Sequence, residues 1–361
     1  MIGRLLSHDL PRSRWLAAAL VVVVLSLLLA PFLFPGAKAL SVAAKALVFI
    51  LLVASFDLLL GYTGIVSFAH TMFFGIGAYG VAIASTAMGP GAGPVLVGTA
   101  AALVVSLALS LVVGLFSLRV KAIFFAMITL AVASAFQTLA SQLSDFTGGE
   151  DGLSFKVPEL LSPAFELFGG AELLGRVVDG RVITYYGLFT AVALLFLALL
   201  RIVNSPFGRV LQAIRENDFR AEALGFRTVV YRTASNVISA LFATLAGALL
   251  ALWLRYVGPD TTLSFEIMLD ILLIVVIGGM GTMYGAVVGA ALFVLAQNYL
   301  QDLLKWLSAD GGAFAGIPVL SQLVSPDRWL LWLGVLFVLS VYHFPTGIVG
   351  RLRAAAIKGR G

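Results

Sequence analysis

Cysteine is absent from this chain of 361 residues, and charged side chains are scarce, at 11% of the sequence. The lack of cysteine excludes a disulfide framework, a thiolate nucleophile and a zinc site built on thiolates. Soluble domains usually carry about 25% charged and about 45–50% apolar residues, whereas 61% of this chain is hydrophobic. The composition is therefore typical of a protein whose solvent is the lipid bilayer.

The motifs of several enzyme classes are also missing. None of the six lysines is followed by serine or threonine, so there is no P-loop, and neither HExxH nor GxSxG occurs. Residues 75–80, GIGAYG, match the dinucleotide pattern GxGxxG, but no acidic residue lies between Asp57 and Asp145 to hold a ribose. We expect no catalytic residue, no bound cofactor and no metal site in this chain.

Apolar runs predict an all-α fold, a polytopic bundle of membrane helices. A helix needs about 20 residues to cross about 30 Å of hydrocarbon, and the alternating ten-residue segments of a β-barrel are not visible. We expect a single transmembrane domain over residues 1–361, with glycines interrupting the third, eighth and ninth of its ten spans. These spans are residues 15–34, 40–60, 65–86, 95–118, 122–142, 184–203, 231–256, 264–279, 284–303 and 328–346.

Basic residues in short segments indicate which side of the membrane each segment faces. Residues 143–183 hold seven acidic and three basic residues and are expected outside; coupling helices over 204–230 and a basic tail over 347–361 are expected in the cytoplasm. The net charge of +5, spread between apolar runs, indicates this topology and not a nucleic-acid partner. Arg119 and Lys121 place a further short segment inside. Both termini are predicted to be cytoplasmic from these basic residues: Arg4, Arg12, Arg14, Arg351, Arg353, Lys358 and Arg360.

The first 39 residues mimic a signal peptide that ends in AKA, Ala37 to Ala39. The apolar stretch is about 19 residues long, whereas a signal core is typically about 7–15. We therefore expect an uncleaved first helix.

Two glycine-rich breaks occur at matching places, GYTG at 61–64 and GGMGTMYG at 278–285. Interrupted helices at corresponding points of two halves indicate transport sites. Gly281, Gly285 and Gly289 recur every four residues, which predicts one helix face packed closely on a neighbour. The predicted set of break and packing glycines is Gly61, Gly64, Gly75, Gly77, Gly278, Gly279, Gly281, Gly285 and Gly289.

One charged segment, RVLQAIRENDFRAEALGF at 209–226, interrupts the apolar chain. Ser205 and Pro206 predict an N-cap and a first helical residue, and the helix is expected to end near Glu216. Asn217 and Asp218 can cap a second short helix that stops at Gly225. By these features alone, the segment is either a solvated linker or a surface for a partner. An apolar stripe would face the bundle: Phe207, Val210, Leu211 and Ile214.

Four ordered blocks resemble the branched-chain amino acid permease family of LivM type: residues 61–80, 147–153, 204–226 and 276–290. The resemblance covers about residues 40–347 and implies a type II ABC importer permease. It implies these partners: a second homologous permease subunit, two cytoplasmic ATPase subunits that bind ATP-Mg, and a periplasmic substrate-binding protein. The implied location is the bacterial inner membrane. Many members have Gly-Gln-Leu-Ser where this chain has Gly64-Ile65-Val66-Ser67, which leaves the substrate open.

The same resemblance implies that the charged segment docks on the ATPase, since Glu222, Ala223 and Gly225 echo the family's coupling pattern with shortened spacing. ATP-driven motion of the partner would then move a rigid helix pair. The coupling candidates are Arg215, Glu216, Asn217, Asp218, Glu222, Ala223 and Gly225.

Ionisable residues inside a bilayer are expensive and mark functional or paired positions. Asp57 is expected mainly to bond broken backbone near Gly61. Asp270 is expected to pair with Arg255 or, less favoured, to hold a substrate amino group. His70 either lines a polar cavity with Ser67 or is a packing histidine. The predicted translocation path consists of Ser67, Phe68, His70, Phe73, Phe74 and Asp270, the phenylalanines forming apolar walls.

The sequence therefore predicts the permease subunit of an ATP-driven importer of branched-chain amino acids, forming half of the path. Two alternatives remain: an ion-coupled secondary transporter, and an ABC permease for another amino acid or a small amide such as urea. A purely structural membrane subunit would not need the broken helices.

Overall fold

The computed structural model describes residues 13–33, 36–117, 122–166, 172–173, 176–308 and 325–358. Within these residues, ten helical stretches are long and apolar enough to cross a membrane. The ten predicted spans are confirmed, and the protein is a multi-pass membrane protein. The spanning helices are α2 Arg14–Leu33, α3 Ala37–Asp57 with the π-turn η1 Leu58–Tyr62, α4 His70–Met88, α5 Ala92–Ser117, α6 Ala122–Gln142, α8 Gly180–Val203, α11 Thr228–Leu254, α12 Pro259–Thr262 with α13 Phe265–Gly278, α14 Met283–Ser308, and η5 Pro326–Arg328 with α16 Trp329–His343.

The shorter elements lie between these spans. Strand β1 (Leu153–Ser154) pairs antiparallel with β4 (Tyr256–Val257), and β2 (Glu172–Leu173) pairs antiparallel with β3 (Arg176–Val177). The remaining elements are α7 Ser144–Thr147, η2 Gly149–Asp151, η3 Glu159–Leu161, α9 Pro206–Glu216, α10 Asp218–Ala223 and α17 Gly347–Lys358.

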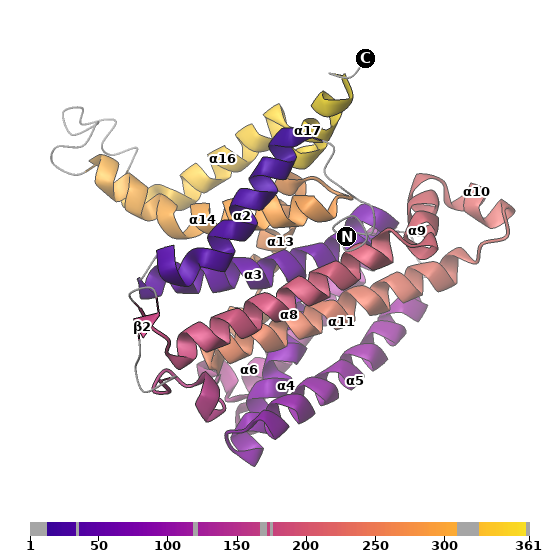
Figure 1. The fold of residues 1–361 in the computed structure, drawn as a ribbon. Coiled ribbons are helices and arrows are strands. Elements are labelled where there is room, and N and C mark those ends of the chain that lie inside the picture. Colours follow the sequence, from indigo (N-terminus) through magenta and orange to yellow (C-terminus); the bar gives the residue numbers. More distant parts are fainter. Residues whose placement is uncertain are drawn as a thin grey trace.

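Helix α3 is the centre of the bundle (Figure 1). It contacts α8 and α11 on one side and α13 and α14 on the other, so nearly every side chain from Leu47 to Asp57 is buried. A helix that is hydrophobic all round is the kind that a bundle surrounds on all faces. Because it connects so many spans, α3 is suited to transmit a displacement from one end of the bundle to the other.

The two ends of the bundle differ, and we name them by what they carry. The coupling end holds α9 and α10, which project beyond the ends of α8 and α11 (Figure 1). The loop end holds the connection between α6 and α8, where β1 joins β4 and where α3 begins.

Both described ends of the chain lie at the coupling end. Leu16 at the start of α2 packs with Tyr284 and with Val349 of α17. The segment expected as a basic tail is therefore a helix that contacts α13 and α14. Five of the basic residues used to predict topology lie outside the described residues: Arg4, Arg12, Arg119, Lys121 and Arg360.

The third span begins later than expected, at His70 instead of residue 65. Gly64 has a φ of 76°, a backbone conformation that favours glycine. The chain leaves the helix there, and residues 65–69 are non-helical. The break therefore lies over residues 64–69 and begins only at the last glycine of the predicted motif at 61–64.

Candidate functional site: the coupling segment and the break junction

The coupling segment, α9 with α10, follows the sequence prediction closely. Pro206 is the first residue of α9, and the helix ends at Glu216. Ser205 does occupy the N-cap position, but the expected cap is wrong: its hydroxyl donates to the Ile202 carbonyl at 2.6 Å and makes no bond to α9. This back-bond ties Ser205 to the end of α8 and helps fix the angle between the two helices.

Asn217 separates the two short helices and begins the second. Its side-chain oxygen accepts a hydrogen bond from the Arg220 amide at 2.9 Å, the geometry of an N-cap. At the other end, Gly225 has a φ of 90°, and the Phe226 amide donates to the Ala221 carbonyl at 3.2 Å. This is a Schellman motif, so the predicted stop at Gly225 is confirmed.

Contacts within the segment stiffen it. Asp218 forms an ion pair with Arg232 of α11 at 2.9 Å, and the Thr228 hydroxyl donates to Glu222 at 2.7 Å. Two of the predicted coupling residues thus brace α10 against α11. Glu216 and Ala223, by contrast, are exposed and make no such brace among the described residues.

The tip of the segment exposes large apolar side chains. Phe219 is 82% exposed and Leu224 72% exposed, while Leu211 and Ile214 of the predicted stripe are buried against the bundle. Phe219 and Leu224 are not among the coupling residues predicted from the sequence. The available signal was their apolar character within an otherwise charged segment.

Arg215 connects the coupling segment to the bundle. Its guanidinium donates to the carbonyl oxygen of Gly61, at the end of η1. Asp57, one turn earlier, accepts a hydrogen bond from the Gly281 amide at 2.8 Å. We call Asp57, Gly61, Gly281 and Arg215 the break junction, because they join both helix breaks to α9.

The break junction has no free space. A Cβ atom on Gly61 would overlap the Asp57 carboxylate and the Gly281 amide nitrogen. Gly281 has a φ of 76°, and an added Cβ would lie 3.0 Å from both the Arg215 guanidinium and the Gly61 carbonyl oxygen. The two breaks, more than 200 residues apart in sequence, therefore touch through backbone atoms.

The other predicted packing glycines make equally close approaches. An added Cβ would overlap backbone or side-chain atoms of a neighbouring element at Gly75, Gly77, Gly278, Gly285 and Gly289. Gly281 was predicted to share one helix face with Gly285 and Gly289, but it lies before that helix, because α14 begins only at Met283. Gly281 belongs to the break, and its positive φ is the physical reason for the glycine.

Most residues predicted for the translocation path lie inside the bundle. His70 is buried, and its Nε2 lies 2.9 Å from the Ser55 hydroxyl and 3.3 Å from the Leu52 carbonyl oxygen, which is the environment of a packing histidine. Ser67, Phe73 and Phe74 are also buried. Phe68 is half-buried, with its ring centroid 6.1 Å from that of Phe265.

The expected pairing of Asp270 with Arg255 is wrong. Asp270 accepts a hydrogen bond from the Gln297 side chain at 3.0 Å, and Lys45 is close enough for a favourable charge interaction. Arg255 has a φ of 57° at the end of α11, and its guanidinium donates to the Leu161 carbonyl at 3.3 Å. Burial, together with the nearby Arg181 charge, lowers the pKa of Arg255. The turn at Arg255 directs it toward the loop, away from α13.

Comparison with known proteins identifies the family. A family model described as the permease component of branched-chain amino acid transport systems matches residues 38–341. This chain belongs to that family. The permease is therefore a transporter subunit and not a catalytic enzyme, and family members work in assembly with other transporter components.

Individual relatives agree with this assignment. The permease is 28% identical over 302 residues to the high-affinity branched-chain amino acid transport system permease protein LivM of Salmonella typhimurium, covering 80% of this chain and 69% of that protein. The LivM protein of Escherichia coli is 27% identical over the same shares. A probable LivM protein of Methanocaldococcus jannaschii is 27% identical over 64% of this chain and 61% of its own length. No solved structure matches this permease.

Proposed function

We propose that this permease is the transmembrane subunit of an ATP-driven importer of branched-chain amino acids. We also propose that α9 and α10 bind the ATPase subunits and are moved by them when ATP is used. ATP-Mg would bind to separate ATPase subunits, two per transporter. A second homologous permease would complete the path, and a periplasmic protein would deliver the amino acid. The membrane would be the bacterial inner membrane, with the coupling end and both termini in the cytoplasm.

The observation that carries this proposal is the geometry of the coupling segment. Phe219 and Leu224 offer an apolar surface at its tip, while Arg215 at its base holds Gly61. A partner bound at the tip would thus act on the break junction through a braced pair of short helices. Tightly packed elements move as bodies, because interiors of this density are not continuously deformable.

Association with ATPase subunits tests the docking surface. We expect the double variant Phe219→Asp, Leu224→Asp to lose co-purification with candidate ATPase subunits that associate with the unaltered permease, because two charges would be buried in an apolar contact. The matched control is Phe146→Asp, the same change at a residue 69% exposed at the loop end. Undiminished association of the double variant, or equal loss in the control, would refute docking at the tip.

Uptake in proteoliposomes tests the energy source. We expect leucine uptake by the assembled transporter to require ATP on the side of α9 and α10 and to persist when ionophores dissipate ion gradients. Uptake that needs an ion gradient and no ATP would instead identify a secondary transporter. Competition by isoleucine and valine, but not by urea, would assign the substrate class.

A further inference from the structure

A cavity of about 420 Å³, with both charged and apolar lining residues, opens at the loop end of the bundle, far from the coupling segment. It lies between α3, the end of α11, α12 with α13, and α14. Apolar walls come from Phe49, Leu250, Trp253 and Ile267. The remaining lining includes charged residues of both signs: Lys38, Lys45, Asp260, Glu266 and Asp270.

Three side chains from three different helices form a polar chain along this cavity. The Lys45 ammonium donates to the Gln297 amide oxygen at 2.9 Å, and the Gln297 amide nitrogen donates to Asp270 at 3.0 Å. The Gln297 amide lies between the Lys45 ammonium and the Asp270 carboxylate. Among the described residues, Lys45 and Asp270 therefore form no direct ion pair.

This arrangement is unusual for residues within membrane helices. Lys45 lies in the third turn of α3 and Asp270 in the second turn of α13, on the inner side of both helix ends. A charged side chain at bilayer depth is costly even on insertion scales. A purely structural contact would be served by a closed ion pair. Here each charge instead reaches the cavity with hydrogen-bonding capacity to spare, since an ammonium has three donors and a carboxylate about four acceptor positions.

We propose that this cavity binds a zwitterionic amino acid, with its carboxylate at Lys45 and its ammonium group at Asp270. Gln297 sets the separation of the two charges. An aliphatic side chain then lies against Phe49, Leu250 and Trp253, because ligand pockets combine apolar walls with a few fixed polar groups. The proposal rests on the transport function proposed above, and it assigns the substrate-recognising groups to the loop end of this chain.

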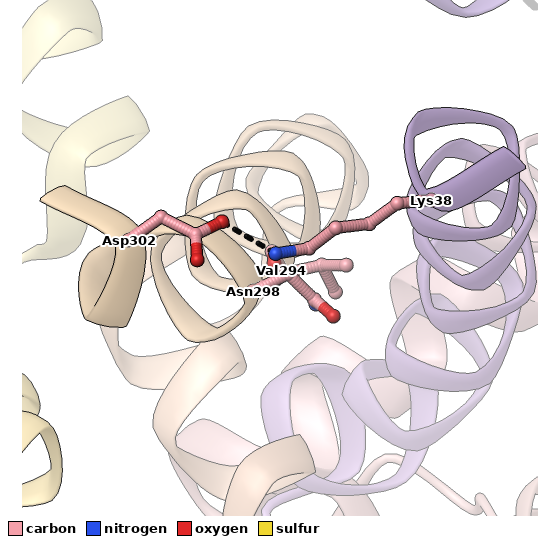
Figure 2. A network of polar contacts seen from close by, with 4 residues as sticks. All are labelled: Lys38, Val294, Asn298 and Asp302. Atoms are coloured by element: carbon pink, nitrogen blue, oxygen red, sulfur yellow. Dashed lines mark hydrogen bonds and ion pairs between the residues drawn. The ribbon is translucent and has the colours of Figure 1, made fainter. Parts of the chain in front are cut away.

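An exposed ion pair lies at the mouth of the cavity. Figure 2 shows Lys38 of α3 reaching across to Asp302 of α14, beside Asn298 and Val294. The Lys38 and Asp302 side chains are 55% and 57% exposed. This outer pair lies one to two helical turns closer to the end of the bundle than Lys45 and Gln297.

Ligand competition tests the orientation of the zwitterion. The probe is radiolabelled leucine bound to the reconstituted transporter without binding protein. The competitors are leucinamide, which lacks the carboxylate, and N-acetylleucine, which lacks the ammonium group. For the unaltered transporter we expect both analogues to bind at least about tenfold more weakly than leucine, since a hydrogen bond to a charged group contributes a factor of this size.

The two variants should then change selectivity in opposite directions. In Lys45→Met, leucinamide is expected to bind as well as leucine while N-acetylleucine stays weak. In Asp270→Asn, N-acetylleucine should equal leucine while leucinamide stays weak. Lys156→Met, which changes an exposed lysine of the loop end that does not line the cavity, should leave both ratios unchanged, and Lys45→Arg should keep the preference for leucine over leucinamide.

Several results would overturn the site. These are no saturable leucine binding, no discrimination by the unaltered transporter, or an equal loss for all three ligands in both variants. If Lys45→Met does not fold, the selectivity of Asp270→Asn still decides the matter. ATP-driven uptake is measured on the same samples. Uptake without the reciprocal selectivity rejects this cavity alone, whereas selective binding without ATP-dependent uptake rejects the proposed function.

Discussion

At one end of α3, Asp57 is buried in the break junction, with its carboxylate bonded to a backbone amide and glycines packed around it. At the other end, Lys45 is half-buried and faces an open cavity. Helix α3 thus carries one acidic side chain in a closely packed junction and one lysine beside an open cavity. We propose that the closed end transmits displacement from α9 and that the open end admits a ligand. Experiments that alter one end and not the other can separate these two roles.

The largest effect is expected from Gly61→Ala at the closed end. The new methyl group would overlap Asp57 and the Gly281 amide, and overpacking of this kind costs about 1–3 kcal/mol or more. We expect a lowered thermal midpoint of the purified protein and loss of uptake. Gly187→Ala in α8 is the control, since nothing lies within 4 Å of its added methyl group. A Gly61→Ala protein as stable as the control would show that the junction has room.

Arg215→Ala tests transmission without filling space. It removes the hydrogen bond from α9 to the Gly61 carbonyl, a bond from a charged donor that contributes about 1.5–3 kcal/mol. We expect ATP-driven uptake to fall at least about tenfold, with ATPase association retained. Arg209→Ala, an exposed arginine of the same helix, should keep full uptake. Equal rates for the two variants would remove Arg215 from the coupling path.

Much of this architecture could be predicted from local sequence signals. The lengths of the apolar runs predicted the ten spans. Pro206, Asn217 and Gly225 predicted the bounds of α9 and α10, because helix caps and helix stops depend on residues only a few positions away. The glycine breaks were also visible as motifs. What these signals share is that cause and effect lie within one or two helical turns.

The partners of polar residues could not be predicted in the same way. Asp57 bonds a backbone amide 224 positions away, and Lys45 bonds a side chain 252 positions away. Such contacts depend on how helices pack, which no local pattern specifies. The wrong pairing of Asp270 with Arg255 has the same origin, since a single positive φ at Arg255 redirects its side chain. The roles predicted for Ser67, His70 and the phenylalanines in the path stay predictions.

A smaller effect is expected from Asn217→Ala in the coupling segment. Loss of an N-cap costs about 1 kcal/mol, and α10 has only six residues, so the change should fray α10 locally. Hydrogen exchange of amides 218–224 should accelerate several-fold, while α3 and α11 remain protected. Gln212→Ala, at an exposed position of α9, should leave that exchange unchanged. Unaltered exchange in Asn217→Ala would mean that the braces from Asp218 and Glu222 alone hold α10.

The smallest effect is expected from Lys38→Met at the mouth of the open end. Its pair with Asp302 is more than half exposed, and exposed ion pairs contribute about 0–1 kcal/mol and weaken with salt. We expect the thermal midpoint to change by no more than a degree or two, as it should in Asp302→Asn and in the double variant. Lys45→Met alters a lysine of the same helix with the same substitution but removes a charge from within the cavity. A large loss of stability in Lys38→Met would mean that the Lys38–Asp302 pair closes the cavity and does not merely flank it. Both ends of α3 would then be closed by tight contacts, and the contrast between them would fail.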